Sequence, residues 1–225
     1  MIEKNKRFIG KYGLKRLLLL GILTIFGSFP ATINYIFPEI NDKIKYLVAV
    51  IYIIGAILIY KNLYKNFKLP KSFMENFLVV LTSIILIFIY NTIIDFVSGG
   101  FYDTPDNQAF IEQMLDVSFS INLLSYLVVF APILEEYTFR EFLPGLLRKI
   151  IRIKNSNRAD LACLILANVL FALAHGPKNT YDFSTYFFLG LSLVIIRYKT
   201  NNLKLSAISH ITWNFISVLI LYLSL

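Results

Sequence analysis

Apolar residues in this chain are gathered into long blocks, separated by short polar or basic stretches. Most blocks approach the roughly 20 residues that a helix needs to cross the hydrocarbon core of a bilayer. The pattern therefore predicts an all-α fold, a polytopic membrane helical bundle of about seven transmembrane helices. The expected spans are residues 17–37, 46–60, 73–97, 118–134, 161–175, 181–196 and 205–225.

The first expected span follows a basic leader, residues 1–16, and this arrangement has two interpretations. A cleaved signal peptide also has a basic region followed by an apolar one. We favour an uncleaved span, because no clear small-x-small cleavage site follows and because Pro30 and Pro38 are typical of a kink and a stop. No repeat or linker is evident, so we expect a single transmembrane domain over residues 1–225.

Composition agrees with a membrane protein and narrows its partners. The chain has 225 residues, of which 57% are hydrophobic and 16% aromatic, and its mean hydropathy is +0.65. Its 22 Lys and Arg outnumber its 14 Asp and Glu, but they stand in short clusters between apolar blocks, so nucleic acid is not an expected partner. The single cysteine, Cys163, excludes a disulfide within the chain.

The positive charges predict an orientation. If the amino terminus is cytoplasmic, the interior segments 1–16, 61–71, 148–158 and 197–204 hold 18 of the 22 Lys and Arg. This bias is the positive-inside pattern of membrane proteins. Residues 101–117 are acidic and contain no Lys or Arg, which predicts an exterior loop after a helix break at Ser98-Gly99-Gly100.

Two carboxylates and a guanidinium follow the fourth block at Glu135, Glu136 and Arg140. On a helix, Glu136 and Arg140 share a face and can pair, whereas Glu135 is turned about 100° away and is free for other work. A salt bridge at the end of an amphipathic helix is the plain structural interpretation. Ionisable groups at membrane depth are costly, so each is also a candidate for function.

The chain has only two histidines, and both lie in or beside apolar blocks. His175 shares a helical face with Phe171 and Asn168, and His210 shares one with Asn214. Either histidine alone could be an ordinary core residue. Together with the carboxylates they are the inventory of a hydrolase that lacks a side-chain nucleophile.

These residues carry a resemblance to the CPBP family of intramembrane proteases, also called the ABI or type II CAAX prenyl endopeptidase-like family. Its members include CAAX-processing enzymes, bacteriocin-processing and bacteriocin-immunity proteins, and the lysostaphin-resistance type. The resemblance covers about residues 119–218, and Glu141 stands where the family often has Gly. It implies variable amino-terminal helices over 1–117 and a catalytic core over 118–225. The three matching motifs are Glu135-Glu136-x-x-x-Arg140, Phe171-x-x-x-His175 and His210-x-x-Trp213-Asn214.

The resemblance implies that the protein is a peptidase with four catalytic residues. Glu135 would be the general base that activates a water, helped by His175, and His210 with Asn214 would bind the oxyanion. Glu136 and Arg140, with Phe171, would support the site, either by bracing the helix or by binding a substrate carboxylate. The expected substrate is a membrane-associated peptide or protein, and the expected location is the plasma membrane of a bacterium.

Three alternatives stay open at this point. Glu135, His175 and His210 could hold zinc, although we expect no cofactor and a metal-free glutamate mechanism. The protein could be a catalytically silent immunity or scaffold relative, or a transporter with buried ionisable residues.

The two histidines are expected at different depths along their helices. At 1.5 Å per residue, His175 lies roughly 20 Å from the cytoplasmic start of its helix and His210 about 10 Å from the start of its own. A shared site therefore favours a fifth helix that begins in the cytoplasm.

Overall fold

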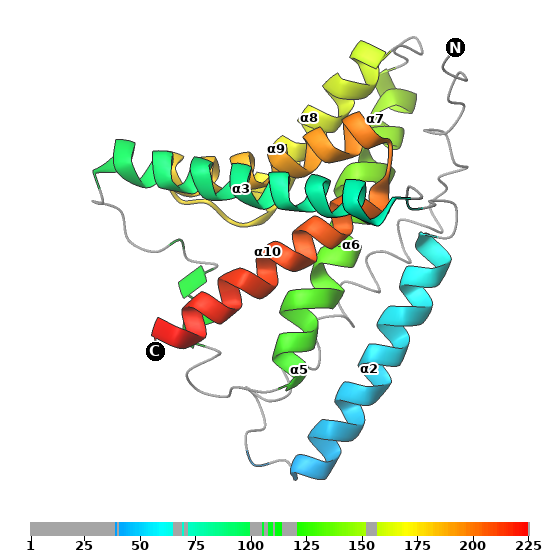
Figure 1. Cartoon of the computed structure of the whole chain (residues 1–225), viewed down its shortest axis with the longest axis vertical. Helices are drawn as coiled ribbons and strands as arrows, with labels where there is room; N and C mark the ends of the chain where they lie inside the picture. The colour runs from blue at the N-terminus through cyan, green and yellow to red at the C-terminus, as the bar shows by residue number, and fades with distance from the viewer. Residues whose placement is uncertain are drawn as a thin grey trace.

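The computed structural model describes residues 41–64, 72–99, 121–151 and 157–224, together with positions 39, 69, 105, 108–109 and 111–113. Within these residues every regular element is helical, and Figure 1 shows how the helices cross. The elements are α2 (Asp42–Leu63), α3 (Phe73–Ser98), α5 (Ile121–Leu124), η2 (Ser125–Phe130), α6 (Ala131–Tyr137), η3 (Thr138–Phe142), α7 (Leu143–Ile151), α8 (Asn157–Ala174), α9 (Thr180–Thr200) and α10 (Leu203–Ser224), where η denotes a π-helical segment.

Four of the described helices are long and apolar enough to cross a membrane: Lys43–Leu63, Phe73–Ser98, Asn157–Ala174 and Leu203–Leu223. They contain or closely overlap the expected spans 46–60, 73–97, 161–175 and 205–225. The all-α fold is therefore confirmed for the described residues, and four of its helices are suited to a membrane. The expected first span, 17–37, lies outside the described residues, and the count of seven spans and the cytoplasmic amino terminus stay predictions.

Local sequence explains where these helices begin and end. Ser72 precedes α3, and its hydroxyl accepts a hydrogen bond from the backbone N–H of Glu75 at 3.3 Å. The same helix ends at Gly99, whose φ of 67° is a left-handed conformation that favours glycine, so the expected break after the third span is confirmed. Asn179 caps α9 through a bond from the backbone N–H of Asp182.

Residues 121–151 form one continuous helical segment that contains two π-helical turns, η2 and η3. A proline stands two residues after each turn, at Pro132 and Pro144. Proline lacks an N–H and its ring crowds the carbonyl four residues earlier, whereas a π turn bonds each carbonyl to a residue five positions later. The wider turns therefore let this segment pass both prolines without breaking.

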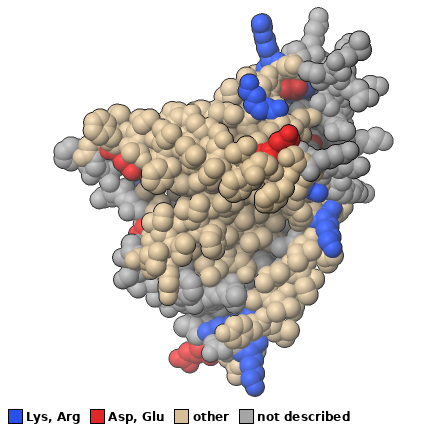
Figure 2. All heavy atoms as spheres, in the orientation of Figure 1, with Lys and Arg blue, Asp and Glu red and all other residues tan. Residues whose placement is uncertain are grey.

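The helices pack around α10 and α9. α10 packs against α3, α6 and α9, and α9 also packs against α3 and α8. α2 and α3 carry many exposed apolar side chains, as expected of surfaces that face lipid. In Figure 2 the middle of the visible face is formed by uncharged residues, and Lys and Arg lie toward its margins.

α8 begins at Asn157, four residues before the expected start of the fifth span at residue 161. The extension adds polar residues at the amino end of this helix and agrees with the fifth helix that we favoured. His175 lies one residue beyond α8, and His210 lies in the first half of α10. Both histidines nevertheless line the same cavity.

Candidate active site

Glu135 and Glu136 are adjacent in α6, but their side chains have different surroundings. The Glu135 side chain is 31% exposed and lines a cavity of about 620 Å³. The Glu136 side chain is fully buried, at 0%. The two neighbouring carboxylates therefore face different environments, as their helical spacing predicts.

Glu136 is held by three polar side chains from α10 and from its own helical segment. His210 Nδ1 donates to Glu136 Oε1 at 3.1 Å, and the Ser206 hydroxyl donates to Oε2. Arg140 Nε lies 3.7 Å from Glu136 Oε1, and this ion pair is fully buried. The expected Glu136–Arg140 pair is confirmed, and its link to His210 connects it with the site.

Arg140 is enclosed by protein. Its Nη2 donates to the carbonyl of Gly190 at 3.2 Å, and its guanidinium carbon lies 4.6 Å from the centre of the Phe171 ring. The side chain is 0% exposed and does not line the cavity. These contacts favour bracing of the helices over binding of a substrate carboxylate.

Gly190 in α9 permits this close packing. A Cβ at this position would lie 2.1 Å from Asn168 Oδ1, 2.9 Å from Phe171 Cδ1 and 3.0 Å from Arg140 Nη2. Asn168 Nδ2 in turn donates to the carbonyl of Phe187 at 2.9 Å, which holds α8 against α9. A side chain of any size at 190 would push these groups apart, so glycine is required by the close approach.

His175 lies at the end of α8 with one nitrogen engaged. Its Nδ1 is 2.7 Å from the carbonyl oxygen of Phe171. A carbonyl only accepts hydrogen bonds, so Nδ1 carries a proton, and in the neutral imidazole Nε2 then has a lone pair. The Tyr186 ring stacks on the imidazole with a centroid distance of 4.2 Å and an interplanar angle of 20°, which fixes its plane.

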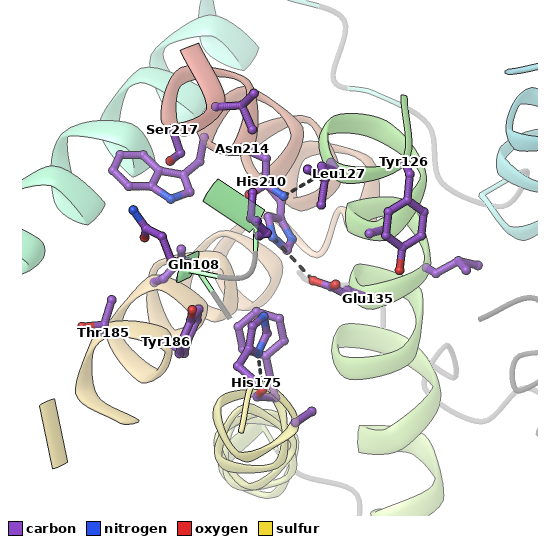
Figure 3. Close-up of a pocket in the computed structure, with 18 of the residues that line it drawn as sticks. Gln108, Tyr126, Leu127, Glu135, His175, Thr185, Tyr186, His210, Asn214 and Ser217 are labelled. Carbon is purple, nitrogen blue, oxygen red and sulfur yellow. Dashed lines mark hydrogen bonds and ion pairs between the residues drawn. The ribbon is translucent and has the colours of Figure 1, made fainter. Parts of the chain in front are cut away.

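His210 lies between the two carboxylates. Its Nδ1 faces Glu136, and its Nε2 is 3.7 Å from Glu135 Oε2. Figure 3 shows Glu135 and His210 pointing toward one another across the cavity, with His175 on the same cavity. One imidazole therefore connects the buried carboxylate with the exposed one.

Asn214 follows His210 by one turn of α10 and also lines the cavity. Its Nδ2 donates to the carbonyl of Leu127 in η2 at 2.9 Å (Figure 3). The cavity is thus bordered by Glu135 from α6, His175 from the end of α8, and His210 and Asn214 from α10. The structure brings together all four residues predicted to be catalytic.

Comparison with protein families gives a match to the type II CAAX prenyl endopeptidase Rce1-like family over residues 117–216. Residues 117–216 belong to this CAAX protease-like family. The matched segment includes Glu135, His175, His210 and Asn214, and it agrees with the range 119–218 inferred from the motifs. Comparisons with curated proteins and with solved structures find no significant match.

The match over residues 117–216 supports an intramembrane endopeptidase at the level of the family. The apolar helices described above agree with the membrane setting of such enzymes. Glu141, which departs from the usual family pattern, lies away from the cavity. It accepts a hydrogen bond from Arg197 Nη2 at 2.8 Å, and Arg197 Nη1 also donates to Asn201 at 2.7 Å. This carboxylate therefore ties η3 to the end of α9.

Sequence reasoning missed several residues around the site. Tyr126 and Tyr186 line the cavity, and Ser206 and Gly190 support the buried carboxylate and arginine.

The π turn in η2 explains why Tyr126 lines the cavity. Tyr126 precedes Glu135 by nine residues, which in an ideal α-helix would separate their side chains by about 180° around the helix axis. The extra residue in a π turn reduces this angle to roughly 80°. Pro132 was the available signal for that turn.

The zinc alternative requires three ligands that converge. Within the part of the chain that the structure describes, no group of three or more His, Cys, Asp or Glu side chains is arranged to hold a metal ion. His175 Nδ1 is engaged by a carbonyl, and His210 Nδ1 is engaged by Glu136, which leaves Nε2 as the nitrogen of each ring through which a metal would bind. The use of a metal stays a prediction in both directions, and we derive no step through one.

Proposed function

We propose that this protein is an intramembrane endopeptidase of the glutamate type, which hydrolyses a peptide bond in a membrane-associated peptide or protein. The observation that carries the proposal is the convergence of Glu135, His175, His210 and Asn214 on one cavity among apolar helices. We propose the plasma membrane of a bacterium as its location, with several helices crossing the bilayer.

Glu135 is suited to be the general base. Its carboxylate is partly exposed to the cavity and accepts no hydrogen bond from the buried network of Glu136. A water between Glu135 and the free Nε2 of His175 gives its proton to Glu135 as its oxygen attacks the peptide carbonyl carbon. His175 orients this water by accepting its second hydrogen.

His210 and Asn214 are suited to bind the oxyanion. Asn214 has a second N–H on Nδ2 beyond the one given to Leu127. His210 donates from Nε2 when its imidazole is protonated, because Nδ1–H is given to Glu136. The tetrahedral intermediate then collapses as the C–N bond breaks, and the proton held by Glu135 passes to the leaving amine.

Glu136 and Arg140 are proposed as supporting residues. Glu136 fixes the orientation of the His210 ring, and Arg140 compensates the buried charge of Glu136. Neither side chain lines the cavity. This division leaves one carboxylate for chemistry and the other for structure.

The test is cleavage of a panel of labelled membrane peptides by the purified protein in detergent. The comparison is between the unchanged protein, Glu135→Gln and a matched control, Glu141→Gln, each with and without a zinc chelator. Cleavage that is lost in Glu135→Gln, kept in Glu141→Gln and resistant to chelation is the expected result.

Loss of cleavage on chelation would replace the metal-free mechanism by the zinc alternative. Cleavage that persists unchanged in Glu135→Gln would refute the proposed base. If no peptide is cleaved, the variant is compared with the unchanged protein in the cell. A phenotype that survives Glu135→Gln there would favour the silent immunity or scaffold relative.

A further inference from the structure

The carbonyl of Leu127 has no backbone donor available in its own helix. In an α-helix it would accept from the N–H of residue 131, and in a π turn from residue 132. The N–H of Ala131 is given to the carbonyl of Tyr126, five residues earlier. Residue 132 is proline and has no N–H. Pro132 therefore leaves the Leu127 oxygen open as an acceptor.

The side-chain amide of Asn214 donates a hydrogen bond to this carbonyl. Its Nδ2 donates to the Leu127 carbonyl at 2.9 Å across 87 residues of sequence, and the bond is partly buried. Leaving a buried carbonyl without a partner is unfavourable, so the bond holds the amide at this point. The bond also uses one defined N–H of Asn214 and fixes the direction of the other.

We propose that Pro132 is a positioning residue for Asn214. By withholding a backbone N–H it reserves the Leu127 carbonyl for the Asn214 amide, and so sets the donor that faces the cavity. Pro132 itself is buried and does not line the cavity, so it acts through Asn214 and not on a substrate. The functional part of this inference rests on the proposed peptidase activity, whereas the structural link does not.

Pro144 offers a matched control in the same helical segment. The N–H of Leu143 is given to the carbonyl of Thr138, five residues earlier, and Pro144 follows as Pro132 follows Ala131. Pro144 is also buried, but the carbonyl five residues before it belongs to Phe139 and is not the partner of Asn214. Substitution of Pro144 therefore supplies an N–H in a similar setting without competing with Asn214.

The experiment is a double-mutant cycle of Pro132→Ala and Asn214→Ala, with Pro144→Ala beside it, in the full chain purified in detergent. Loss of one oxyanion donor costs about 100-fold or more in kcat, and a misplaced donor is expected to cost roughly tenfold with KM little changed. Pro132→Ala should show this loss when Asn214 is present and no further loss in Asn214→Ala. Pro144→Ala should keep its kcat.

Thermal unfolding of the same variants tests the link without turnover. Asn214→Ala should lower Tm more in the unchanged protein than in the Pro132→Ala background. Pro132→Ala supplies a backbone N–H at position 132, and this N–H can bond to the Leu127 carbonyl when the Asn214 amide is absent. Pro132→Val supplies the same N–H with more bulk and repeats the test if Pro132→Ala is poorly folded. Equal Tm losses in both backgrounds would overturn the proposed link.

Failure of the inference is distinguishable from failure of the proposed function. An active protein in which Pro132→Ala slows turnover equally with and without Asn214, or in which Pro144→Ala is equally slow, would refute the positioning role alone. A protein without any turnover would challenge the peptidase proposal. The Tm cycle would still decide whether Pro132 controls the Leu127–Asn214 bond.

Discussion

The two faces of α6 differ in how completely their polar groups are used. On the buried face, Glu136 is bonded by His210 and Ser206 and paired with Arg140. On the cavity face, Glu135 is 31% exposed, and none of the described residues bonds to His175 Nε2. A buried charge is tolerated when it is paired, whereas a group that reacts with substrate or water must keep an accessible lone pair or N–H. Adjacent glutamates in one helix thus serve structure and chemistry separately.

The largest expected effect comes from removing the open carboxylate. Glu135→Gln should lower kcat by about 100-fold to 10,000-fold, because the amide cannot take a proton from water. Its Tm should change little, since the side chain is partly exposed and lies outside the buried network. Peptide cleavage and thermal unfolding in detergent measure the two quantities. A large loss of Tm with kcat preserved would reverse the roles assigned to the two faces.

Glu136→Gln, unlike Glu135→Gln, should lower the stability of the protein strongly. It leaves the charge of Arg140 buried without its counter-charge, which costs about 3 kcal/mol of unfolding free energy. Activity should also fall, because the amide has one acceptor oxygen and turns its NH2 toward either His210 or Ser206, both of which donate to Glu136. Denaturant or thermal unfolding checks the stability loss. Stability equal to that of Glu135→Gln would show that the buried pair contributes nothing.

Gly190→Ala tests the packing behind the buried face. The added Cβ would lie 2.1 Å from Asn168 Oδ1, so neighbouring side chains must move, at about 1 to 3 kcal/mol. Gly55→Ala is the matched control, because a Cβ there meets nothing within 4 Å and helix propensity favours alanine. Thermal unfolding should separate the two variants. Equal stability of both would contradict the close approach at Gly190.

Tyr64→Phe is the smallest expected change. The hydroxyl of Tyr64, at the end of α2, donates to the carbonyl of Ile133 in α6 at 2.8 Å. Its removal should cost about 1 kcal/mol of unfolding free energy and leave kcat unchanged, because neither Tyr64 nor Ile133 lines the cavity. A marked loss of kcat would mean that α2 controls the catalytic face as well.

Residue spacing was enough to predict much of the site. The i, i+4 relation predicted the Glu136–Arg140 pair and the different orientation of Glu135, because side chains of one helix keep a fixed angular relation. The motifs likewise identified Glu135, His175, His210 and Asn214, all of which line the cavity. His210 was expected to bind the oxyanion together with Asn214. Its bond to Glu136 was not foreseen, because the two lie 74 residues apart.

Apolar blocks and short motifs determined the helical membrane fold and the candidate residues, because helix periodicity and the cost of charge in lipid act locally along the chain. Only the tertiary structure decided which groups meet: the π turn that brings Tyr126 to the cavity, the glycine that admits Arg140, and the Leu127 carbonyl that holds Asn214. Such pairings join distant segments. They depend on helix register and on interhelical distance, and no local pattern encodes either quantity.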